Sequence, residues 1–191
     1  MNRRTYLATL SAASGATLAG CGAVFGPTTL GPPEETLDDD RMEKALTYRR
    51  DGDRIATLAL EQRREQQSPR DRFPFRLSVW HNDDTYIEQF QFDLRTPPTS
   101  VDPPAEVYLR TPGDDLWSGL TFHRVENNWT RIALDDAGQL GEGTVTLETI
   151  IDPVGQPADE VGVRAELTLS RSGPGRGYAI DTSTRFEPVT A

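Results

Sequence analysis

Apolar and polar residues alternate along most of this chain. The longest alternating run holds an apolar residue at every second position: Val161, Val163, Ala165, Leu167 and Leu169. A second run divides residues 73–80 into the apolar set Phe73, Phe75, Leu77 and Val79 and the intervening set Pro74, Arg76, Ser78 and Trp80. Successive side chains of a strand point to opposite faces of its sheet, so each run predicts a strand with one buried face.

The same pattern predicts strands from residue 45 to residue 186. The expected ranges are 45–50, 55–60, 73–80, 86–94, 107–109, 120–125, 129–134, 145–151, 161–169 and 178–186. Tyr86, Phe90, Phe92 and Leu94 are expected to share the buried face of their strand. A helix over residues 37–48 is the main alternative to the first strand.

Turn residues separate these runs. Asp51-Gly52 favours a tight hairpin, because glycine accepts positive φ, and residues 82–84 and Asn127-Asn128 mark further turns. Short strands joined by turns predict an all-β fold, an antiparallel immunoglobulin-like β-sandwich of about 8–10 strands. Only the architecture is predicted, since the Cys-Trp-Cys pattern of antibody domains is absent.

The N-terminus carries a different signal. Arg3 and Arg4, followed by Leu7, match a twin-arginine export signal, and residues 18–21, Leu-Ala-Gly-Cys, match a lipobox that would lipidate Cys21. The uncharged stretch between them is too short to span a bilayer. We therefore expect a signal peptide over residues 1–20, a lipidated Cys21 with a flexible Gly/Pro-rich tether over 21–41, and the β-sandwich over 42–191.

The charge of the chain is strongly negative and almost free of lysine. Thirty acidic residues oppose twenty basic ones, a formal net charge of -10, and lysine occurs only at Lys44. Such a surface retains water and tolerates molar salt, where screening weakens self-repulsion. Together with the N-terminal signal, this composition resembles haloarchaeal surface lipoproteins exported by the twin-arginine route. The resemblance implies a halophilic protein at the extracytoplasmic face of the cell membrane, anchored through lipid at Cys21.

Several chemistries find little support. The negative charge opposes nucleic-acid binding, and lipidation of the single cysteine excludes a disulfide. No metal is expected: His81 and His123, with Asp83 or Glu126 nearby, lack the spacing of a zinc site. Residues 135–142 lack the pattern of a calcium loop, although calcium binding by an acidic loop stays open. Residues 173–177 are glycine-rich, but a strand follows where a phosphate loop needs a helix.

No cofactor and no catalytic residue are predicted, so a binding role is favoured over an enzyme. Asn128 begins the sequon Asn-Trp-Thr and is a possible glycosylation site on an exported chain. The loop 63–72 is rich in arginine. The pleat of the following strand sends Arg76 and Trp80 away from the core, so Arg72, Arg76 and Trp80 are the predicted docking patch for a partner.

Three functions remain open. The first is a surface interaction module that binds another envelope protein, and an exposed apolar or arginine-rich patch would favour it. The second is a solute- or sugar-binding module, which needs Trp80, Trp117 or Trp129 exposed on one face. The third is an envelope enzyme, which needs a pocket with convergent polar groups.

Overall fold

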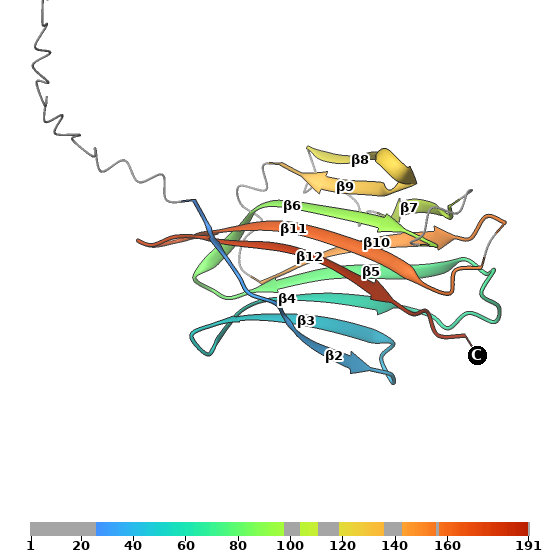
Figure 1. Ribbon diagram of the computed structural model, residues 1–191, viewed down its shortest axis with the longest axis horizontal. Coiled ribbons are helices and arrows are strands. Elements are labelled where there is room, and N and C mark those ends of the chain that lie inside the picture. Colours follow the sequence, from blue (N-terminus) through green and yellow to red (C-terminus); the bar gives the residue numbers. More distant parts are fainter. Residues whose placement is uncertain (1–25, 98–103, 111–118, 136–142, 156, 191) are drawn as a thin grey trace, which may run out of the picture.

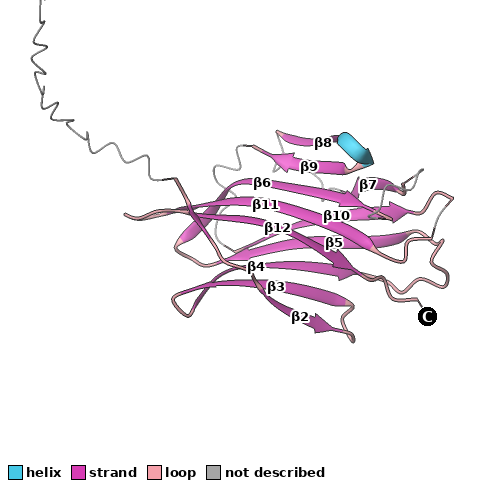
Figure 2. Cartoon of the chain, viewed as in Figure 1, coloured by secondary structure: helices cyan, strands magenta, loops and turns pink. Residues whose placement is uncertain are grey.

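The computed structural model describes residues 26–97, 104–110, 119–135, 143–155 and 157–190. Twelve strands lie within them: β1 Thr28–Thr29, β2 Glu34–Asp38, β3 Glu43–Arg50, β4 Asp53–Gln62, β5 Phe73–His81, β6 Thr85–Arg95, β7 Glu106–Arg110, β8 Leu120–Arg124, β9 Thr130–Leu134, β10 Thr144–Asp152, β11 Val161–Arg171 and β12 Tyr178–Phe186. The only helical element among these residues is a short 3₁₀ turn, Glu126–Asn128 (Figure 2). The segment 37–48 is therefore strand and turn rather than helix.

The strands form two packed sheets (Figure 1). One has the order β1-β12-β11-β6-β9-β8 and is here called the β12 sheet; the other has the order β2-β3-β4-β5-β10-β7 and is called the β5 sheet. Neighbouring strands are antiparallel except for the short parallel pair β1–β12. The predicted all-β sandwich is confirmed.

The core lies between the sheets and follows the alternation in the sequence. Phe73, Phe75, Leu77 and Val79 are at most 1% exposed, and the apolar residues of β11 are at most 2% exposed. The face predicted for β6 is wrong at its start. Pairing with β11 passes from Gln89 to Ile87 and skips Glu88, which is a β-bulge, so Ile87 instead of Tyr86 points into the core.

The folded domain begins earlier than the boundary predicted at residue 42. The Thr28 and Leu30 amides donate to the carbonyls of Gly177 and Ala179 at 2.8 and 2.9 Å, and the Leu30 side chain is buried. β2 then pairs with β3 in the other sheet. Residues 28–38 therefore belong to the sandwich, because backbone pairing and one buried leucine outweigh their Gly/Pro-rich composition.

The outer face of the β12 sheet holds a buried ion pair. Asp93 of β6 and Arg131 of β9 are directly opposite each other, with Nε–Oδ1 and Nη2–Oδ2 distances of 2.7 and 2.8 Å. The Asp93 side chain is only 4% exposed, whereas that of Arg131 is 32% exposed. The neighbouring Arg164 places its guanidinium 4.1 Å from the ring centre of Trp129, which is also buried.

Candidate docking face

The outer face of the β5 sheet consists of rows of residues that cross the strands. The strand register gives five rows from one end to the other: Thr57, Trp80 and Thr144; Ala59, Ser78 and Thr146; Glu61, Arg76, Glu148 and Arg110; Pro74, Ile150 and Tyr108; and the acidic pair Asp152 and Glu106. The first two rows are uncharged apart from the Arg54 side chain that covers Trp80. The charged row and the apolar row lie together toward the start of β5, so the chemistry of this face changes along the strands.

Arg76 lies at the centre of the charged row and is held by two carboxylates. Its guanidinium is 2.7 Å from Glu148 and 3.4 Å from Glu61, and Glu61 also pairs with Arg63 at 2.6 Å. The pKa of Glu148 is lowered, first by its hydrogen bond from Arg76 and then by the positive charges of Arg76, Arg110 and Arg63. Arg76 therefore organises this row, and its charge is already compensated within the domain.

The apolar row ends in an exposed group that we call the arginine–tyrosine cluster: Tyr108, Arg63, Arg72 and Arg110. The Tyr108 side chain is 48% exposed, and its hydroxyl donates to Glu106, which raises its pKa; the nearby Arg72 charge opposes that shift. Within the described residues, Arg72 and Arg110 form no ion pair. A cleft of about 230 Å³ lies between Arg63, Arg110, Glu148 and Pro74. The cluster therefore presents two guanidinium groups, unpaired in the described part of the chain, beside an exposed tyrosine, with the carboxylates Glu106 and Glu148 close by.

Trp80 lies at the other end of the face. The pleat sends it away from the core, as predicted, but the ring is half-buried, because the Arg54 guanidinium carbon stacks 3.7 Å from its centre. Eight residues separate Arg72 from Trp80, about 26 Å along a strand. The structure thus distributes the predicted patch over the length of the face and leaves only Arg72 in an exposed cluster. Sequence reasoning missed Arg110 and Tyr108, whose strand joins this face only through pairing with β10.

A family model described as a domain of unknown function, DUF8121, matches residues 28–190. The chain belongs to this family. The match begins at the first residue of β1, which agrees with the start of the sandwich in the structure. No match is found among curated proteins.

The DUF8121 domain is similar to several solved β-domains at low identity. A type I cohesin from Pseudobacteroides cellulosolvens is 9% identical, with a TM-score of 0.43 over 67% of this chain and 89% of the cohesin. The human F-spondin reeler domain is 10% identical, with a TM-score of 0.40 over 70% of this chain and 91% of the reeler domain. A collagen-binding domain from a Staphylococcus aureus adhesin is 6% identical, with a TM-score of 0.34 over 59% of this chain and 87% of that domain.

The two tryptophans among the described residues lie on different sheets. Trp80 lies on the β5 sheet beneath Arg54, and Trp129 is 6% exposed and lies beneath Arg164 beside the β12 sheet. Trp117 lies outside the described residues. The described tryptophans thus give a sugar ring no open face on which to stack.

The remaining predicted positions are scattered. His81 is fully buried in the β5 sheet, with Nδ1 3.2 Å from the Thr85 hydroxyl, whereas His123 is exposed on β8 of the other sheet. Asn128 is half-exposed at a φ of 61°, which confirms the turn; glycosylation there stays a prediction. No group of three or more potential metal ligands occurs in the described part of the chain. Arg3, Arg4, Cys21 and residues 136–142 lie outside it.

Membrane attachment was predicted through Cys21 rather than through a helix of the domain. None of the helical structure among the described residues has the length and hydropathy needed to cross a bilayer. Lipidation and export stay predictions from the sequence.

Proposed function

We propose that this chain is a lipid-anchored cell-surface protein whose DUF8121 domain docks an acidic partner protein through the arginine–tyrosine cluster. The observation that carries the proposal is the gathering of Arg63, Arg72, Arg110 and Tyr108 at one end of one face, on a chain with a net charge of -10. Arginine and tyrosine are enriched among the residues that dominate interface energies. Arg72 and Arg110 form no ion pair within the described residues, so both guanidinium groups can pair with carboxylates of a partner.

The cluster lies at the end of the sandwich opposite the point where the chain enters it. β1 pairs with the first residues of β12, which pair with the last residues of β11. Those residues of β11 pair in turn with the first residues of β6. The short turn 82–84 places the end of β5, with Trp80, at this same entry end. Arg72 precedes β5 and therefore lies at the far end, as the path of the strands in Figure 1 shows.

This placement supports a protein partner over lipid head groups. Thr28 follows Cys21 by seven positions in the chain, and even a fully extended stretch of seven residues reaches only about 25 Å. A lipid on Cys21 would keep the entry end close to the membrane. The arginine–tyrosine cluster would then face away from the bilayer, toward other molecules of the cell envelope.

The anchor is tested by Cys21→Ser in the native host. Two lipid chains suffice for stable attachment, so the variant should appear in the medium or accumulate as unprocessed precursor. A separate Arg3→Lys/Arg4→Lys variant should remain inside the cell. Normal processing and unchanged membrane retention of Cys21→Ser would overturn the anchoring proposal.

The docking face is tested by photo-crosslinking in cells, with a crosslinking phenylalanine analogue at position 108. An adduct with an acidic surface protein should form, and Arg72→Glu/Arg110→Glu should abolish it. The matched control is Arg49→Glu/Arg50→Glu, which reverses two exposed arginines at the entry end and changes the net charge equally. The docking role would be refuted if both double variants gave equal amounts of adduct, if only lipid adducts formed, or if position 108 formed no adduct.

A further inference from the structure

At one edge of the sandwich, β2 of the β5 sheet has no described strand of the β12 sheet opposite it. In the β12 sheet, β1 pairs only with Tyr178 and Ala179, and no described strand pairs with the rest of that edge. In the β5 sheet, β2 continues one strand beyond β3. The inner face of β2 is therefore not covered by a strand of the opposite sheet.

Leu37 marks this uncovered position. It lies opposite Lys44 in the β2–β3 register, and Lys44 shares the inward face of β3 with the fully buried Leu46. An inward leucine of a sandwich is normally buried, yet Leu37 is 70% exposed. Isolated exposed apolar residues are common, but Leu37 also borders a groove of about 370 Å³.

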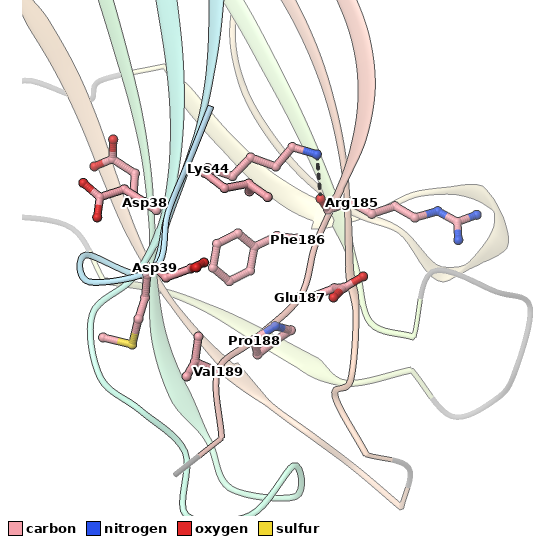
Figure 3. A pocket seen from close by; sticks show the side chains of 11 residues that line it. Asp38, Asp39, Lys44, Arg185, Phe186, Glu187, Pro188 and Val189 are labelled. Atoms are coloured by element: carbon pink, nitrogen blue, oxygen red, sulfur yellow. Dashed lines mark hydrogen bonds between the residues drawn. The ribbon is translucent and has the colours of Figure 1, made fainter. Parts of the chain in front are cut away.

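The groove has Phe186 among its lining residues, between the β2–β3 turn and the C-terminal tail (Figure 3). Phe186 is 5% exposed at its base and packs edge-on against Phe75 of the core, 5.2 Å between ring centres. One wall is the β2–β3 turn, and the other is the C-terminal tail. That tail is fixed by the buried Gln62, whose side chain bonds the backbone of Val189 at 2.6 and 3.0 Å.

Backbone groups of β12 face its free edge, and the groove lies at the Arg185 end of that edge. The Gly177 and Ala179 carbonyls accept bonds from the β1 side, and the two-residue repeat of a strand turns Asp181, Ser183 and Arg185 to the same edge. The Arg185 carbonyl accepts a bond from the Lys44 ammonium at 3.2 Å (Figure 3). No described strand pairs with Asp181 and Ser183 at this edge. A free strand edge is a template for an added strand.

The charge around the groove is negative. Its two cations already have carboxylate partners, Lys44 with Glu35 at 2.8 Å and Arg185 with Glu160 at 3.1 Å. Three lining carboxylates form no ion pair within the described residues: Asp39, Glu43 and Glu187. An occupant that covers Leu37 is therefore favoured if it carries positive charge.

We propose that this groove binds an extended, basic segment of a partner protein, which adds as a strand to β12 beside Asp181 and Ser183. Alternate apolar side chains of the segment cover Leu37 and Phe186, and a lysine or arginine lies near Glu43 and Glu187. Lys44 is displaced from the Arg185 carbonyl as the segment binds. The site is separate from the arginine–tyrosine cluster and selects the opposite charge, so either proposal can fail alone.

The probe is a fluorescent peptide of about eight residues that alternates valine or threonine with lysine, enough to follow the free edge. Its affinity for the purified full chain is measured by fluorescence anisotropy up to about 1 mM peptide. A glutamate version should bind at least about tenfold more weakly, and a version with central prolines should not bind, because proline cannot complete the strand pairing.

Two variants and one backbone measurement locate the site. Leu37→Glu should weaken peptide binding at least about tenfold, whereas Phe122→Glu, at another exposed apolar position on edge strand β8, should leave it unchanged. Bound peptide should slow hydrogen exchange at the Asp181 and Ser183 amides. No binding up to about 1 mM, equal binding of the proline peptide, or unchanged exchange at both amides would overturn the proposal, as would a dimer of the unliganded chain built on this edge.

Discussion

The buried Asp93–Arg131 pair allows a quantitative test of how the outer face of the β12 sheet is stabilised. The two partners differ in exposure, 4% for the Asp93 side chain and 32% for that of Arg131. Replacing Arg131 with methionine keeps the apolar stem and leaves a buried carboxylate without its guanidinium. Replacing Asp93 with asparagine removes the buried charge and leaves an arginine that can turn toward water. The two substitutions should therefore have unequal costs.

The expected size follows from the geometry. Removing one partner of a buried pair costs about 3–5 kcal/mol, and Arg131→Met should cost about 3 kcal/mol because water reaches this pair from the arginine side. Arg164 lies opposite Asp93 on β11 and could replace the lost charge, but only by leaving Trp129. Asp93→Asn should cost about 1.5–2 kcal/mol, the lower part of the range for a hydrogen bond to a charged group. The double variant Asp93→Leu/Arg131→Met should recover to within about 1 kcal/mol of wild type, because no buried charge remains.

The assay is urea unfolding of all four proteins at one fixed salt concentration, since screening alters ion pairs. The free energies of unfolding form a double-variant cycle. The reasoning is refuted if Arg131→Met costs less than about 0.5 kcal/mol or if Asp93→Asn costs more than Arg131→Met. A double variant less stable than Arg131→Met would also contradict it.

Two further predictions concern the whole domain and its entry end. Trp80→Ala should lower the free energy of unfolding, measured in urea, by about 2 kcal/mol. This is near half the value for a core tryptophan, because the ring is half-buried beneath Arg54. A loss below about 0.5 kcal/mol would contradict this packing. The melting temperature should rise between about 0.1 M and 1 M potassium chloride, because the Debye length falls from about 10 to 3 Å and screens the net charge of -10. A flat or falling melting temperature would show that the acidity is not an adaptation to salt.

The sequence by itself determined which residues face the core along most strands. Phe73, Phe75, Leu77 and Val79 are buried as their alternation predicts, since a two-residue period leaves only one way to hide them. It also determined the turn at Asn128. Both features depend on neighbouring residues, so no knowledge of distant pairing was needed.

Tertiary structure decided everything that depends on which strands meet. Pairing with β11 created the bulge at Glu88 and turned Ile87 instead of Tyr86 inward. β1 lies in a Gly/Pro-rich segment and is a strand because it pairs with the edge of β12. No described strand pairs with the rest of that edge, so Leu37 is left uncovered. Tyr108 belongs to the candidate docking face only because β7 pairs with β10. Such pairings join residues far apart in sequence. They depend on backbone hydrogen bonds, which are alike for every residue type except proline, so the sequence carries no periodic pattern that predicts them.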